Sequence, residues 1–186
     1  MTEVHRPGAQ EYLYYLVQGL IISVALTYFF ENMARRLVTD FFSTRMAGFV
    51  LIVVLAPIIE EYFKVYPLFA RHAETARSLI KLGFFSGLGF GISEFFVYVF
   101  FVGAPVGIRI PGLLFHAAST SIAASGFSKN EFPMFYAIAV VLHAVNNFFA
   151  ELGDIWFFAG LATVLLAYIL AYREYSTAED EYTIAP

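Results

Sequence analysis

Six long apolar segments constrain the fold of this chain more than any other feature. They lie at about residues 11–30, 47–70, 79–102, 110–127, 132–150 and 153–172. A bilayer core of about 30 Å takes roughly 20 helical residues to cross, and in lipid a lone segment satisfies its own backbone hydrogen bonds only as a helix. We therefore predict an all-α fold, a polytopic membrane helix bundle of about six transmembrane helices with a polar site inside.

The composition agrees with one membrane domain and excludes several other classes. With 60% hydrophobic and 14% charged residues, the chain is too apolar for an ordinary soluble domain. Cysteine is absent, which excludes disulfides and thiolate chemistry, and no basic patch predicts nucleic-acid binding. We expect one transmembrane domain over residues 1–173 and a polar, disordered tail over 174–186. The first segment is interpreted as an uncleaved span, and residues 31–45 as an amphipathic interfacial connection.

Lysine and arginine in the short loops indicate how the chain crosses the membrane. With the N-terminus inside, the inner side carries Arg6, Arg71, Arg77, Lys81, Lys129 and Arg173, and the outer side carries Arg35, Arg36, Arg45 and Arg109. This bias favours cytoplasmic N- and C-termini in an integral, multi-pass membrane protein. The polar residues of the later segments then lie in the outer half of the bilayer.

Three ionisable groups lie inside the second apolar segment: Glu60, Glu61 and Lys64. A charge in hydrocarbon costs about 2.5–3.5 kcal/mol by insertion scales, so such groups usually have a function. At about 100° per residue, Lys64 lies angularly between the two glutamates, and we expect its ammonium to bridge them rather than to act on substrate. Pro57 removes the hydrogen bond to the Val53 carbonyl and is expected to open or kink the helix. The plainer alternative is a charge-neutralised cluster that only pins helix packing.

The next three segments each present a small or polar face. In the third, Glu94 follows a stripe of glycines that lets another helix approach closely, so its carboxyl points into the bundle. The fourth and fifth segments carry the stripes His116, Ser119, Thr120 and His143, Asn146, Asn147. One buried histidine is usually a satisfied core residue, but two at similar depth in adjacent helices favour a shared site.

These groups permit hydrolysis by an activated water. A glutamate can act as general base, and an imidazole or a carboxamide can donate to the oxyanion of a tetrahedral intermediate. No cofactor is expected on this interpretation, although zinc is possible, with Glu60, Glu61, His116 and His143 as its ligands. Two rival hypotheses stay open: a transporter or channel subunit that handles protons or a cation, and a haem protein with His116 and His143 as axial ligands.

Four short motifs, one in each of the second to fifth segments, resemble those of the PrsW family of intramembrane proteases, which are related to CAAX prenyl proteases and bacterial immunity proteins. They are Glu60-Glu61-x-x-Lys64, Gly89-Phe-Gly-Ile-Ser-Glu94, His116-Ala-Ala-Ser-Thr120 and His143-Ala-Val-Asn-Asn147. Gly112 stands where the CAAX relatives have Phe, and Lys64 comes one residue earlier than their Arg. Both departures favour PrsW over a prenyl protease.

The resemblance implies an endopeptidase that cleaves membrane-anchored proteins, in the type case an anti-sigma factor. By the same resemblance Glu60 or Glu61 activates water, His116 and His143 assist, and Asn147 contributes to the oxyanion site. Lys64, Glu94, Thr120 and Asn146 are expected to support them. The expected partners are a membrane-anchored protein substrate and the lipid bilayer, with no nucleic acid. The sequence predicts no oligomeric state.

Overall fold

The computed structural model describes residues 6–70 and 75–178, and every element in these two ranges is helical. The first run is α1 (Ala9–Val17), η1 (Gln18–Ser23) and α2 (Val24–Phe41); the second is α3 (Thr44–Val50), η2 (Leu51–Leu55), α4 (Ala56–Val65) and η3 (Tyr66–Ala70). Then follow α5 (Ala76–Phe96) with η4 (Val97–Val102), α6 (Val106–Ser128), α7 (Phe132–Leu152), η5 (Asp154–Trp156) and α8 (Phe157–Thr177). The segments η1, η2 and η4 are π-helical, and η3 and η5 are 3₁₀.

In the described ranges, five helical runs are long and apolar enough to cross a membrane: Ala9–Phe41, Thr44–Ala70, Ala76–Val102, Phe132–Leu152 and Asp154–Thr177. The sixth predicted span, α6, has 23 residues but is less apolar, because it carries a histidine and several serines. From Phe115 to Gly126 its side chains are buried in protein. The fold is therefore the predicted all-α polytopic membrane bundle.

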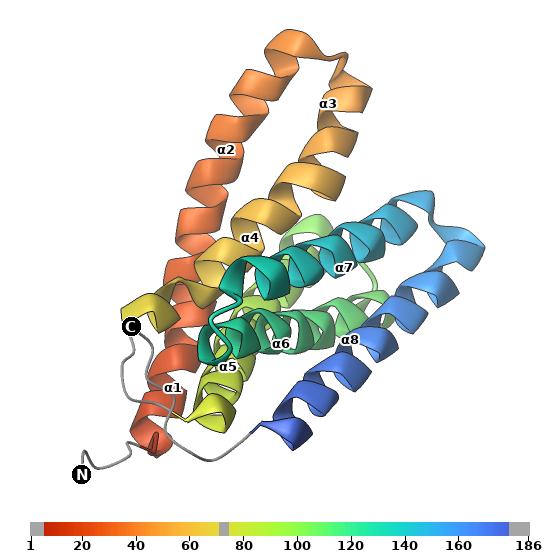
Figure 1. Cartoon of the computed structure of the whole chain (residues 1–186). Helices are drawn as coiled ribbons and strands as arrows, with labels where there is room; N and C mark the ends of the chain where they lie inside the picture. The colour runs from red at the N-terminus through yellow and green to blue at the C-terminus, as the bar shows by residue number, and fades with distance from the viewer. Residues whose placement is uncertain (1–5, 71–74, 179–186) are drawn as a thin grey trace.

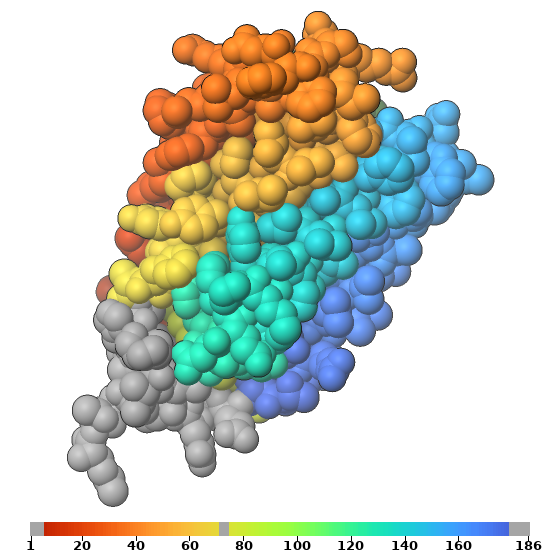
Figure 2. Space-filling view, turned by 45° about the horizontal axis from the view of Figure 1, so that its top comes forward, coloured from red at the N-terminus to blue at the C-terminus, as the bar shows by residue number. Residues whose placement is uncertain are grey.

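The helix α6 is the centre of the bundle. Every residue from Phe115 to Gly126 is buried, and the helix contacts α4, α5, α7 and α8 (Figure 1). The helices α3, α4, α7 and α8 lie side by side over one face of the molecule (Figure 2). A histidine placed on α6 is thus surrounded by other helices, which is why its polar partners must come from them.

Glycines on α5 allow two neighbours to approach to backbone contact. A Cβ at Gly87 would lie 2.2 Å from the His116 carbonyl oxygen of α6, and one at Gly89 would lie 2.0 Å from the Leu16 carbonyl oxygen of α1. Real Cβ atoms do not come so close, so both positions require glycine. The small-residue stripe predicted for this segment therefore sets how near α6 lies to α5.

A buried polar network ties the first helical run to α4 and α5. Gln18 Nε2 donates to Ser23 Oγ at 2.8 Å, and Ser23 Oγ donates to the Phe63 carbonyl at 2.7 Å. From α5, Ser86 Oγ lies 2.6 Å from the Lys64 carbonyl oxygen and 3.0 Å from Gln18 Oε1. Buried polar groups need partners, so these contacts hold the end of α4 in one position.

Two sequence expectations about boundaries need correction. The connection over residues 31–45 does not form a separate interfacial piece, because α2 continues without a break to Phe41 and the turn falls at Phe42 and Ser43. At the other end α8 continues to Thr177, so the beginning of the predicted tail is helical, and Glu174 pairs with Lys129. The rest of that tail, residues 179–186, lies outside the described residues.

Candidate active site

The site begins with three charged side chains on one side of α4. Lys64 Nζ donates to Glu61 Oε1 at 2.8 Å and lies 3.6 Å from Glu60 Oε2. All three residues are buried, Lys64 and Glu61 completely. The spacing explains this arrangement, because residues three and four apart share one helix face. The predicted bridging of the two glutamates by Lys64 is confirmed.

Glu61 is occupied on one oxygen by three donors. Besides Lys64, the Oε1 atom accepts from Ser119 Oγ at 3.0 Å and from His143 Nδ1 at 2.8 Å. A carboxylate only accepts, so the hydrogen of the His143 ring lies on Nδ1 and the lone pair lies on Nε2. Glu61 therefore fixes both the orientation and the tautomer of His143.

His116 is fixed in the same way by Glu94 and Lys64. Its Nε2 pairs with Glu94 Oε2, and its Nδ1 lies 2.8 Å from Lys64 Nζ. An ammonium only donates, so Nδ1 must accept with its lone pair, while Nε2 carries the hydrogen toward the carboxylate. Both partners thus require the same tautomer.

Arg109, at the start of α6, secures the second oxygen of Glu94. Its guanidinium nitrogen lies 3.2 Å from Glu94 Oε1, and the guanidinium carbon lies 3.7 Å from the centroid of the Tyr98 ring. Arg109 and His116 are seven residues apart, on one face of α6. Two side chains of α6, Arg109 and His116, therefore bind the two carboxylate oxygens of Glu94.

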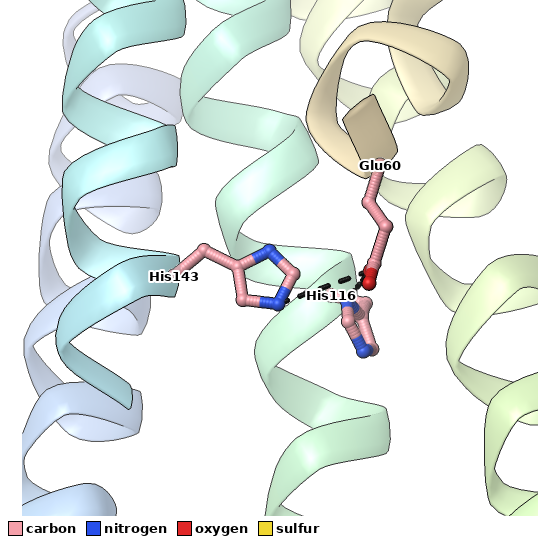
Figure 3. A group of neighbouring side chains, drawn as sticks. All are labelled: Glu60, His116 and His143. Atoms are coloured by element: carbon pink, nitrogen blue, oxygen red, sulfur yellow. Dashed lines mark ion pairs between the residues drawn. The ribbon is translucent and has the colours of Figure 1, made fainter. Parts of the chain in front are cut away.

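Three acceptor atoms, one carboxylate oxygen and two imidazole nitrogens that carry no hydrogen, converge as a result (Figure 3). Glu60 Oε2 lies 4.0 Å from His116 Nδ1 and 3.8 Å from His143 Nε2, and all three lie within 4.8 Å of one another. Glu60 Oε2 is buried and has no hydrogen-bond partner among the described residues. One carboxylate and two imidazoles suit a zinc ion, whose bonds to nitrogen and oxygen are about 2.0–2.2 Å. The donor set and the unpartnered oxygen both fit a divalent metal.

The structure separates Glu61 from the metal ligands that were suggested from the sequence. Its Oε1 atom already serves Lys64, Ser119 and His143, and Glu61 is not part of the convergent group. Glu61 lies behind His143 and binds the ring nitrogen that faces away from the convergent group. Glu94 binds His116 in the same way. Carboxylates behind metal-binding histidines fix the ring and raise the basicity of the ligand.

Asn147, Thr120 and Asn146, predicted at the site, have other surroundings. Asn147 Nδ2 donates to the Ile52 carbonyl at 3.0 Å. The Thr120 hydroxyl is buried, faces Gly87 and has no hydrogen-bond partner in the described ranges. The Asn146 side chain lies near Gly160 of α8.

The bond made by Asn147 follows from Pro57. At the end of the π-helical segment the Ala56 N–H donates to the carbonyl of Leu51, five residues earlier. The next donor in that register would be Pro57, which has no N–H to offer Ile52. Asn147 supplies to the Ile52 carbonyl the hydrogen bond that Pro57 cannot give in the π-helical register. The sequence prediction named the Val53 carbonyl, because it assumed the α-helical register.

Sequence reasoning did not assign two residues that the structure brings to the cluster, Arg109 and Ser119. Arg109 was counted only as a loop charge, one residue before the predicted span. Its seven-residue spacing from His116 was the signal that could have placed it on the same helix face. Ser119 was part of the polar stripe of the fourth segment, three residues after His116, but was given no role.

Comparison with known proteins gives one family. A family model described as PrsW family intramembrane metalloprotease matches residues 9–172. No curated protein and no solved structure matches the chain. The matched range runs from the first turn of α1 into α8 and includes every residue of the cluster. The chain therefore belongs to the PrsW family of intramembrane metalloproteases.

Proposed function

We propose that the chain is an endopeptidase that hydrolyses a peptide bond of a membrane-anchored protein, with Glu60, His116 and His143 holding a catalytic zinc ion. One observation carries the proposal: three lone-pair atoms converge in a buried site, and carboxylates outside the group fix both imidazoles. The sequence left zinc possible, and the buried Glu60 Oε2 supports zinc here because it has no hydrogen-bond partner among the described residues.

The side chains of the site have distinct tasks on this proposal. The ion, when bound, supplies Lewis-acid activation of water and of the scissile carbonyl. Glu61 and Glu94 keep the two imidazoles in the ligating tautomer, and Ser119 helps to hold Glu61. The Glu61 Oε2 atom has no hydrogen-bond partner among the described residues and lies outside the group that would hold the ion, so it can accept the proton of the attacking water.

The proposed substrate follows from where the cluster lies. Its members come from the interior of helices that are long enough to span the bilayer or are buried among such helices. A peptide bond that reaches them must itself be at membrane depth, as in a single-pass or membrane-anchored protein such as an anti-sigma factor. We place the enzyme in a prokaryotic cell membrane, the setting that an anti-sigma factor implies, and we place both termini in the cytoplasm on the charge bias of its loops.

The two rival functions have less support. A proton- or cation-handling transporter subunit would use the same carboxylates, but the family description names a protease. A haem between His116 and His143 does not fit, because the two ring centroids are 5.1 Å apart and no porphyrin can lie between them.

The test is cleavage of a single-pass reporter protein in liposomes by the purified enzyme. We expect the wild type to cleave, and Glu60→Gln, His116→Ala and His143→Ala to lose at least about 100-fold in kcat/KM, because each removes a ligand of the site. Glu151→Gln changes an exposed glutamate of α7 and serves as the matched control. Cleavage that survives in all three site variants would exclude the proposed function.

A further inference from the structure

We infer that Lys64 competes with the metal for His116, and so sets the metal affinity of the site. The inference rests on the proposed function, because it concerns the same ligands. Its starting point is a single contact: the Lys64 ammonium lies 2.8 Å from His116 Nδ1. That nitrogen is also one of the three atoms placed to ligate an ion.

The competition is a matter of lone pairs. An imidazole nitrogen without hydrogen has one lone pair in the plane of the ring, and the other nitrogen of His116 carries its hydrogen toward Glu94. The Nδ1 lone pair can therefore accept a hydrogen bond from Lys64 or bind a metal, but it cannot do both. Each ion that takes His116 as a ligand has to break the bond to Lys64.

Lys64 keeps other partners when that bond breaks. Its ammonium lies 2.8 Å from Glu61 Oε1 and 4.6 Å from the centroid of the Phe90 ring, and neither belongs to the convergent group. A small movement away from His116 thus leaves a buried ion pair and a cation–π contact in place. The fully buried ammonium does not have to leave the bundle.

The competition lowers metal affinity by a predictable amount. A hydrogen bond to a charged group contributes about 1.5–3 kcal/mol, which corresponds to about 10- to 100-fold in a dissociation constant. Lys64 also repels a divalent cation through space. The hydrogen-bond contribution requires His116, whereas the electrostatic repulsion does not. Replacing Lys64 in the presence and in the absence of His116 therefore measures the two contributions separately.

The experiment measures Zn²⁺ binding to the purified full-length protein in detergent by competition with a chromophoric chelator. Lys64→Met should bind Zn²⁺ at least about tenfold more tightly than the wild type. In the His116→Ala background the same substitution should have a clearly smaller effect. Lys81→Met, which removes an exposed lysine of α5, should leave the affinity unchanged. Equal tightening in both backgrounds, or none in either, would overturn the inference.

X-ray absorption on the zinc-loaded wild type gives a second measurement that does not depend on a variant that folds. Two imidazole ligands per zinc are expected, because the metal displaces Lys64 from His116. A single imidazole would show that Lys64 keeps its bond and would contradict the inference. Peptide cleavage is assayed separately, so a wild type that fails to cleave while the binding pattern holds would contradict only the proposed function.

Discussion

Arg109 is the residue through which the first turn of α6 acts on the site. It lies 3.2 Å from Glu94 Oε1, and Glu94 in turn holds His116. Arg109→Gln leaves Glu94 free to turn away from the imidazole. We expect kcat/KM to fall about 10- to 100-fold, as is typical when an outer partner of a metal ligand is lost.

Arg109→Lys retains the charge but not the planar fork, and it should recover part of the loss. Zinc affinity should fall in parallel with kcat/KM, a change that a purely structural role would not produce. The control is Arg36→Gln, at an exposed arginine of α2. Unchanged zinc affinity in Arg109→Gln would show that Arg109 does not position His116.

Among the helices, α7 donates hydrogen bonds to the run Thr44–Ala70 on both sides of Pro57. Asn147 donates to the Ile52 carbonyl, and the Tyr136 hydroxyl donates to the Ile58 carbonyl at 2.6 Å. These bonds hold the π-helical segment η2 and the start of α4, from which Glu60 and Glu61 project. The local opening at Pro57 is thus stabilised by a neighbouring helix.

Asn147→Leu separates this role from the oxyanion role that was predicted from the sequence. Loss of the bond to Ile52 should lower the free energy of unfolding by about 1 kcal/mol and leave most of kcat intact. Loss of an oxyanion donor would instead lower kcat by about 10²–10³. Thermal unfolding and kcat per folded molecule measure both, with Asn146→Leu as the neighbouring control. A hundredfold loss of kcat at unchanged stability would support the oxyanion role.

The elements also show what the sequence could and could not predict. Helical periodicity was enough to place Glu60, Glu61 and Lys64 on one face and to turn both histidines inward, because these placements depend only on residue spacing. The contact of Lys64 with His116 and the division of labour between the glutamates depend on how three helices pack. The hydrogen bond of Asn147 to Ile52 could not be predicted, because the change to π-helical register before Pro57 leaves no mark in the spacing of polar residues.

At the scale of the whole molecule, the helix order determines which ends of the bundle share a side of the membrane. The first turn of α1 and the last turn of α8 lie at the same end (Figure 1). The turn at Phe42–Ser43 lies at one end of the bundle, and the turn after Ser128 lies at the other end (Figure 1). If each helix crosses the bilayer, the two turns are on opposite sides of the membrane. The charge bias predicts that the end with α1 and α8 is cytoplasmic.

Cysteine labelling tests this orientation directly, because the chain has no cysteine of its own. Arg45→Cys and Glu131→Cys place single thiols at exposed positions beside the two turns. A maleimide that cannot cross membranes should label only the first variant in intact cells and both after lysis. Labelling of Glu131→Cys alone in intact cells would show that the orientation is the reverse of the proposed one. The substrate would then be cut on the other side of the membrane.

On the proposed function, Glu60, His116 and His143 hold a zinc ion that the protease needs. The most direct measurement combines the zinc content of the purified enzyme with its cleavage of a membrane-anchored reporter. The wild type should hold about one zinc per chain, lose cleavage when a chelator removes it, and regain cleavage when zinc is restored, whereas Glu60→Gln should retain little zinc and no cleavage. A wild type that cleaves at full rate without bound metal would show that the protease does not need a metal ion in this site.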